Sequence, residues 1–161
     1  RGLDRGDEIA AVGDAFTLDD IPLHRMDPLR LRVAANALER LPAFLEAGRD
    51  RAVRRAGMLE RAGAEVLRDD PGGEGIWPFF IVLMPDRDRR DRALGALWRS
   101  GLGVSKLFVR ALPDYPYLAG AVEGGPCPAA RDLAGRMLTV TNTHWLDDAA
   151  FARLAGEICH A

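Results

Sequence analysis

Lys106 is the only lysine in the chain of 161 residues, and 21 arginines supply its other strongly basic side chains. A lone lysine could serve as a reactive amine that forms a Schiff base, provided that burial or neighbouring cations depress its pKa. A pyridoxal enzyme also needs an acid for the ring nitrogen and a cradle for the phosphate. The sequence around GVSKLFV offers no such cradle. We therefore expect Lys106 to be a solvent-facing lysine on an edge strand.

His24 and Arg25 form the second candidate site, because both polar residues lie in the apolar segment IPLHRM just ahead of the first expected helix. A phosphate or carboxylate would suit this pair. A salt bridge to a neighbouring acid at the start of the helix is the alternative. The other two histidines, His144 and His160, fit surface or capping positions. No histidine pair and no C-x-x-C motif has metal-ligand spacing, so the sequence predicts no metal site.

Other familiar catalytic patterns are absent from the sequence. There is no G-x-x-x-x-G-K phosphate loop, no G-x-G-x-x-G between a strand and a helix, and no G-x-S-x-G elbow. The carboxylates are scattered among arginines, so no isolated pair stands out for acid–base chemistry. Cys127 and Cys159 are predicted to be free thiols of a cytoplasmic protein.

The charge pattern argues against nucleic acid and membranes as partners. The net charge is −2, and the arginines alternate with acids, as in DRDRRDR at 86–92, which is typical of a solvated helix face. No apolar run reaches the ~18 to 20 residues that span a bilayer. The chain begins without a signal-peptide core and without Met, which is consistent with a chain that begins inside a longer protein.

Two regions are expected along the chain. Residues 1–26 look like a lead-in arm or loop, and residues 27–161 form one small α/β domain whose first part, 27–63, is a long helical stretch. Asp27 and Pro28 suit the N-cap and first position of that helix. Pro42 predicts a kink or a fresh start within it. Its arginines are expected on the face opposite the apolar stripe.

Three strands and three further helices are expected after the turn cluster DDPGGEG. The segment IWPFFIVLMP predicts a strand buried on both faces, and strands are also expected at about 103–109 and in MLTVTN. Asp86, Pro128 and Asp147 mark the starts of the helices, the last with Leu146 and Phe151 as a hydrophobic staple. The fold class is therefore α/β, with a small sheet of about three strands covered by helices. Whether the strands pair parallel or antiparallel stays open.

The order of these segments resembles the C-terminal part of the DegT/StrS family of PLP-dependent aminotransferases. The family's G-x-N-x-R-M segment and following helix correspond to IPLHRMDPLRLRVAANALERLPAFLEAGRDRAV. Its aromatic strand, its helix, its "Y.PlH" segment and its closing segment correspond to IWPFFIVLMP, RALGALWRSGLG, FVRALPDYPYL and LTVTNTHWLDDAAFARLAGEI. The resemblance covers about residues 21–158.

The resemblance implies a fold-type I aminotransferase, which is a homodimer that binds pyridoxal 5'-phosphate (PLP) and transfers an amino group from an amino-acid donor to a keto sugar nucleotide. This chain would be the small C-terminal domain with its lead-in helix. The Schiff-base lysine would lie before residue 1, so no residue of this chain is assigned a catalytic role. Arg25 and His24 would lie near the partner's cofactor phosphate. An exposed apolar face on the 29–62 helices is expected if a large domain is missing.

Three positions depart from the family pattern. The family's glycine and asparagine fall on Ile21 and Leu23, and its histidine falls on Asp114, whereas Arg25 and Met26 keep the pattern. Leu23 cannot reach a cofactor phosphate as asparagine does. A catalytically inactive, divergent member that serves as a binding or dimerisation module is therefore the alternative. A small regulatory ligand-binding α/β domain of unrelated origin is a third hypothesis.

Overall fold

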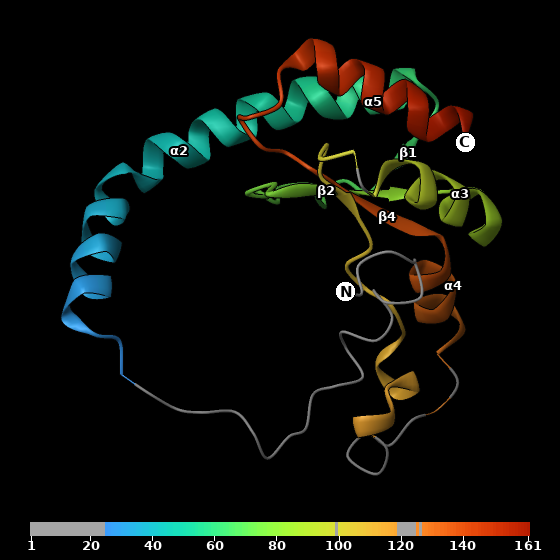
Figure 1. Cartoon of the computed structure of the whole chain (residues 1–161), viewed down its shortest axis with the longest axis horizontal. Coiled ribbons are helices and arrows are strands. Elements are labelled where there is room, and N and C mark those ends of the chain that lie inside the picture. Colours follow the sequence, from blue (N-terminus) through green and yellow to red (C-terminus); the bar gives the residue numbers. More distant parts are fainter. Residues whose placement is uncertain (1–24, 99, 119–124, 126) are drawn as a thin grey trace.

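The computed structural model describes residues 25–98, 100–118, 125 and 127–161. His24, Ile21 and Leu23 lie outside these described residues. The elements are, in chain order, α2 (Pro28–Arg61), β1 (Glu65–Val66), β2 (Phe79–Leu83), α3 (Arg87–Leu97), β3 (Val104–Ser105), the 3-10 turns η1 (Leu112–Asp114) and η2 (Pro116–Leu118), α4 (Pro128–Arg136), β4 (Met137–Thr141) and α5 (Asp148–His160). Figure 1 shows α2 as a long arc whose second half runs beside α5 over the sheet, while its first half extends beyond the sheet.

Helix α2 begins as the sequence predicts. The carboxylate of Asp27 accepts hydrogen bonds from the backbone N–H groups of Leu29 and Arg30, both at 3.0 Å, and Pro28 is the first helical residue. Of the two alternatives expected at Pro42, a kink or a fresh start, the fresh start does not occur, because α2 continues through Pro42 as one helix. Pro42 removes one hydrogen bond, to the carbonyl of Leu38. Leu38 lies on the exposed part of the helix, where solvent can take that bond.

The sheet has four strands in the order β1-β2-β4-β3, and every neighbouring pair is antiparallel. The central pair runs in register from Phe79 opposite Thr141 to Leu83 opposite Met137. This settles the pairing that the sequence left open and adds one strand, β1, to the three expected. With only two residues, β1 is too short to give a periodic signal. The strand expected over 103–109 pairs only at Val104–Ser105.

The core lies on one face of this sheet, between the strands and helices α2, α3 and α5. On β2 the side chains of Phe80 and Val82 are fully buried, whereas Phe79, Ile81 and Leu83 are only partly buried. The prediction that β2 is buried on both faces is therefore wrong. Antiparallel strands tolerate one open face, and their side chains alternate between the two faces.

Helix α5 and its cap match the sequence prediction. The Asp147 carboxylate accepts a hydrogen bond of 2.7 Å from the backbone N–H of Ala150, and Leu146 and Phe151 both pack into the core. The expected placement of the α2 arginines on a solvent face fails at Arg55, which is 1% exposed. Arg55 lies between α2 and the loop that leads into α5, where carbonyls and a carboxylate accept its N–H groups.

Two other sequence expectations concern thiols and membranes. Cys127 and Cys159 are both free thiols, as expected, and burial raises the pKa of Cys159. In the parts of the chain that the structure describes, none of the helices has the length and apolar character needed to cross a lipid bilayer.

Candidate functional site

The predicted site residue Arg25 is exposed and precedes α2 by three residues, and Figure 1 shows this first half of α2 extending beyond the sheet. It lines neither of the two cavities described below. Its predicted companion, His24, is outside the described residues. The role of the pair at a partner's cofactor therefore stays a prediction, and the polar clusters of the domain itself are elsewhere.

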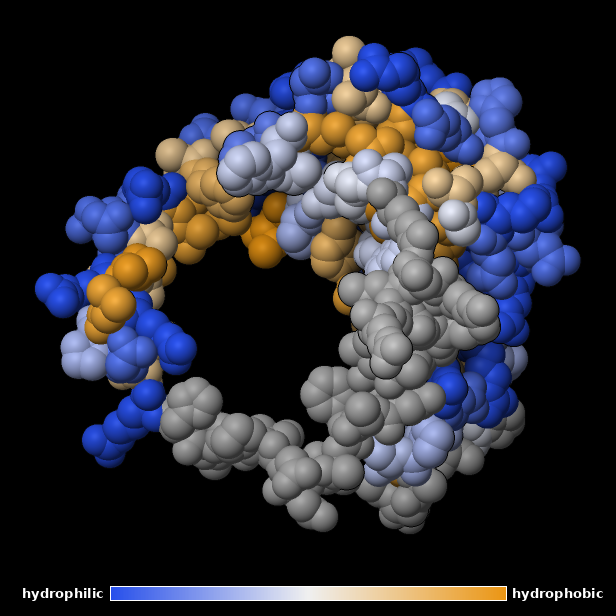
Figure 2. Space-filling model, viewed as in Figure 1, coloured by the Kyte–Doolittle hydropathy of each residue, from blue (hydrophilic) through white to orange (hydrophobic). Residues whose placement is uncertain are grey.

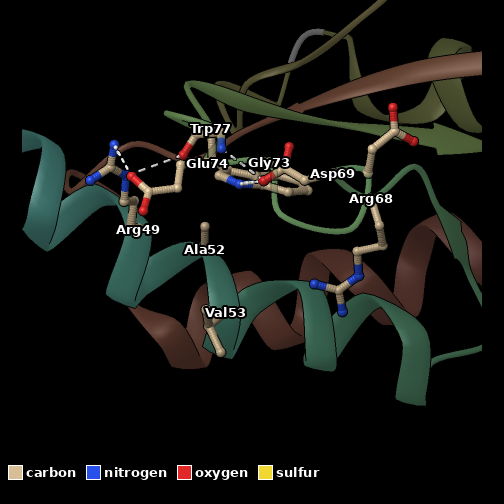
Figure 3. Close-up of a pocket in the computed structure, with 10 residues that line it drawn as sticks. Arg49, Ala52, Val53, Arg68, Asp69, Gly73, Glu74 and Trp77 are labelled. Atoms are coloured by element: carbon tan, nitrogen blue, oxygen red, sulfur yellow. Dashed lines mark hydrogen bonds and ion pairs between the residues drawn. The ribbon is translucent and has the colours of Figure 1, made fainter.

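A first cavity of about 490 Å³ lies between α2 and the loop that joins β1 to β2. Figure 3 shows Arg49 and Ala52 projecting from the helix toward this loop. Arg49 forms an ion pair with Glu74 at 3.6 Å and donates a hydrogen bond of 3.4 Å to the carbonyl of Gly75. The loop is thus tied to the helix at one end of the cavity.

Asp69 fixes the shape of that loop. Its carboxylate accepts hydrogen bonds from the Gly75 backbone N–H at 2.8 Å and from the Trp77 indole Nε1–H at 3.0 Å. A side chain at Gly75 would meet the Asp69 carboxylate and the Trp77 ring at 2.6 Å, so it would displace one of these two groups. Trp77 itself has φ +47°, an unusual conformation for a residue other than glycine. The charges around the cavity are mixed and largely paired with one another, so its chemistry stays undefined.

A second cavity of about 480 Å³ has a distinct chemical character. It lies between α3, the segment that follows β3, and α4, and we call it the cationic cavity. Its polar lining residues are Arg87, Arg90, Lys106, Arg110, Asp114 and Arg131. The structure therefore brings Lys106 and Asp114, two residues that the sequence singled out for separate reasons, into one cavity. Most of the cations around Lys106 come from α3 and α4, outside the GVSKLFV segment.

Arg90 forms the floor of the cationic cavity. Its side chain is 1% exposed, and its guanidinium donates to the Asp91 carboxylate at 2.6 Å and to the carbonyl of Ala134 in α4 at 3.1 Å. Asp91 also pairs with Arg87 at 3.7 Å. The sequence predicts a solvated face for 86–92, but Arg90 points inward. The signal that sequence reasoning missed is the spacing of Arg87 and Arg90, which share one helix face.

Lys106 is half-buried rather than solvent-facing, which corrects the sequence prediction. Desolvation by burial lowers the pKa of its ammonium group, and the positive charges of Arg90, Arg87 and Arg110 lower it further, against an opposing effect of Asp91. Within the described residues, no hydrogen bond or ion pair holds the ammonium group.

Asp114 is held by Arg131 on the opposite wall of the cavity. The guanidinium of Arg131 donates to both carboxylate oxygens, with N–O distances from 2.7 to 3.1 Å. These hydrogen bonds lower the pKa of Asp114 below its usual range and raise that of Arg131. Asp114 is therefore ionised at neutral pH and committed to one partner.

The described residues supply only part of what PLP requires. The cations of the cationic cavity could hold its phosphate, and Lys106 could supply an amine. However, the carboxylate that a pyridine nitrogen would need is bound to Arg131, and no aromatic ring lines the cavity. The cationic cavity does not fit the whole cofactor. No cluster of metal-ligating side chains occurs among the residues described here.

A four-stranded antiparallel sheet with a long lead-in helix and a closing helix defines the class of fold: the chain has the fold of the C-terminal domain of an aminotransferase of the DegT type. It is similar to a solved DegT DnrJ EryC1 StrS aminotransferase from Brucella abortus, with a TM-score of 0.69, 20% sequence identity and 89% of this chain covered. It is also similar to the aminotransferase TlmJ from Streptoalloteichus hindustanus, with a TM-score of 0.61, 24% identity and 78% of this chain covered.

The likeness involves only part of each solved protein. The matched region covers 39% of the Brucella chain and 34% of the TlmJ chain. No protein-family model matches the sequence, and no curated protein matches it significantly. At these identities the likeness establishes the fold.

Proposed function

We propose that this chain is the C-terminal domain of a PLP-dependent aminotransferase that transfers an amino group to a keto sugar nucleotide in amino-sugar biosynthesis. The observation that carries this proposal is the agreement in fold with two aminotransferases over 89% and 78% of the chain. The ordered motifs of the sequence, from IPLHRM to LTVTNTHW, support it independently. In this proposal the Schiff-base lysine belongs to a large domain outside the chain.

The proposal also includes a cellular location and an oligomeric state. The protein works in the cytoplasm as a homodimer, and Arg25 with His24 reaches the cofactor phosphate bound by the partner subunit. Support comes from the exposure of Arg25, which precedes α2 by three residues and is accessible to a second subunit. Phosphate recognition is a natural role for an arginine beside a histidine.

A transaminase test uses the protein that contains this chain, purified with PLP. The expected results are the visible absorbance of a lysine-bound cofactor and, with glutamate as donor, replacement of the carbonyl of a keto sugar nucleotide by an amine. Mass spectrometry follows the product, and 2-oxoglutarate must appear in equal amount. Omitting either substrate is the control. A protein that binds PLP but transfers no amino group to any keto sugar nucleotide contradicts the substrate assignment.

The second candidate is a catalytically inactive relative that serves as a binding or dimerisation module. The observation that favours it is the bidentate pair of Asp114 with Arg131, because this carboxylate occupies the family's histidine position and is already engaged. A protein that forms a dimer by sedimentation but shows no absorbance of bound cofactor would support this candidate over the first.

A further inference from the structure

The cationic cavity is built from three separate segments of the chain. Arg87 and Arg90 come from α3, Lys106 and Arg110 from the segment after β3, and Arg131 from α4. Arg90 is fully buried and bonded to the Ala134 carbonyl of α4, so its position is fixed by the packing of α3 against α4. The cations are therefore held together by the fold, in contrast to long side chains that gather on an open surface.

Positive charge exceeds negative charge around this cavity. Leaving Arg110 aside, four cationic side chains are set against two carboxylates, Asp91 and Asp114, which leaves an excess of two positive charges among these residues. Asp91 is shared between Arg87 and Arg90, and Asp114 pairs with Arg131. Like charges brought this close cost free energy unless an anion compensates them.

Lys106 is the cation of this cavity whose surroundings favour an added anion most directly. Its ammonium group is partly desolvated, lies among arginines, and has no hydrogen-bond or ion-pair partner in the described part of the chain. A half-buried charge without a partner is unfavourable, because burial removes water and nothing replaces it. An anion that binds in the cavity would satisfy Lys106 and relieve the repulsion between the neighbouring arginines.

We propose that the cationic cavity binds a phosphate-bearing ligand, with Lys106 and Arg87 donating to its oxygens above the buried Arg90. A di- or multiply charged phosphate matches the excess of positive charge better than a single carboxylate does. Arginine forks and a lysine point charge are the groups that proteins commonly use for phosphate. The volume of about 480 Å³ accommodates a diphosphate group together with part of the molecule that carries it. This site needs neither PLP nor amino transfer.

A chain with a single lysine permits a selective test. Lys106 is the only lysine of this chain, so the peptide that carries it reports on one amine, and the N-terminal amine of the protein serves as an internal reference for an amine-acetylating reagent. We expect inorganic pyrophosphate to slow the labelling of Lys106, measured by mass spectrometry of its peptide, and to leave the N-terminal amine unchanged. Sodium chloride at equal ionic strength controls for screening, and glutarate tests whether a dicarboxylate does the same.

Calorimetric titration with pyrophosphate measures the binding affinity directly. Some variants should weaken this affinity and another should strengthen it. Lys106→Met should weaken binding about tenfold or more, the effect of losing one charge-assisted hydrogen bond, and Lys106→Arg should restore most of it. Arg87→Gln should also weaken binding, and because its side chain is 74% exposed this variant should fold normally. Asp114→Asn should strengthen binding, since it removes a negative charge and releases Arg131.

The matched control is Arg153→Met, which removes an exposed arginine of α5 that lies outside the cavity lining. It should leave the affinity for pyrophosphate unchanged. Unaltered labelling of Lys106 together with no heat of binding would overturn the proposal. Equal protection by glutarate would overturn the assignment to phosphate. An equal loss of affinity in Arg153→Met would show nonspecific attraction to arginines and would also overturn it.

Discussion

Both the backbone conformation and the packing at position 103 favour glycine. It has φ +75°, and a Cβ atom built there would lie 2.1 Å from Cγ2 of Thr141 on the neighbouring strand. Its carbonyl also accepts a hydrogen bond of 2.9 Å from the backbone N–H of Thr141. Gly103 therefore sets the close approach at which β3 meets β4, directly before the segment that carries Lys106.

Replacing Gly103 with alanine should lower the free energy of unfolding by about 3 kcal/mol, through positive-φ strain of ~1 to 2 kcal/mol and a further overpacking cost. Gly101→Ala is the matched control, because Gly101 has φ +73° but nothing within 4 Å of its Cβ position. That variant should lose only the strain. Chemical denaturation of both proteins measures the difference, and equal losses would show that the contact with Thr141 is easily relieved.

Sequence reasoning singled out two residues of the cationic cavity, but it did not predict which residues surround them or which arginines are buried. Lys106 and Asp114 attracted attention as a lone lysine and as a departure from the family pattern, but their common cavity depends on α3 and α4 meeting. Arg90 and Arg55 could not be told from solvated arginines, because their burial is decided by partners more than 40 residues away along the chain. Periodicity within one helix carries no information on such partners.

At the scale of elements, Arg55 joins α2 to α5. Its guanidinium donates to the Asp148 carboxylate at 3.0 Å and to the Thr143 carbonyl at 2.8 Å, and also to the Leu146 carbonyl. Its Cζ atom lies 4.7 Å from the centroid of the Phe151 ring. The hydrogen bond with Arg55 is the main cause of the lowered pKa of Asp148, and burial lowers the pKa of Arg55 itself.

Asp148→Asn should reduce the free energy of unfolding by about 1 to 2 kcal/mol at neutral pH, because the Asp148 side chain is partly exposed and its pair is partly screened. Arg55→Met should cost more, since three acceptors lose their donor at once. Thermal or chemical unfolding measures both. Arg153→Met on the exposed face of α5 is the control for a lost arginine and should have little effect.

This pair also predicts a pH dependence. The folded-state pKa of Asp148 is below its unfolded value of about 3.9, so its contribution is complete above that pH and is lost as the pH falls through the folded pKa. The stability difference between the natural protein and Asp148→Asn should therefore shrink below about pH 4. A difference that stays constant from pH 7 to pH 3 would contradict a stabilising ionised pair.

The starts of the helices were largely predictable, because each N-cap depends only on residues that are close to it in the sequence. Asp27, Asp86 and Asp147 begin their helices as predicted, because a side-chain oxygen within three residues satisfies the first N–H groups. Strand lengths were not predictable, because they are set by pairing. β3 stops at Ser105 although apolar residues follow, and one face of β2 is only partly buried although its sequence is apolar throughout.

At the scale of the whole molecule, one apolar stripe runs along the full length of α2. Its second half, at Gly48, Ala52, Ala56 and Leu59, packs against the core. The same spacing continues toward the N-terminus at Leu31, Leu38 and Leu41, which remain exposed, with Leu38 63% exposed. Figure 2 shows this apolar colouring continuing along the arc of α2 beyond the sheet. The exposed apolar face expected from the sequence is therefore present.

We expect the exposed half of this stripe to mediate association of the chain, as apolar patches of this kind usually mark an interface. Sedimentation analysis should show association that increases with concentration, and Leu38→Gln with Leu41→Gln should abolish it. Glu39→Gln on the same part of α2 is the control and should leave association unchanged. A chain that is monomeric at all concentrations would assign the stripe to a segment or domain outside this chain.

Pro42 lies where the supported half of α2 ends and the unsupported half begins. Residues before it have few tertiary contacts, so they remain helical mainly through the Asp27 cap and helix propensity, and an isolated helix of this length is marginal in water. Whatever covers the stripe would therefore also stabilise the helix that presents it. Docking and helix formation are then coupled, so part of the binding free energy is spent on ordering α2, and the measured affinity reports both processes.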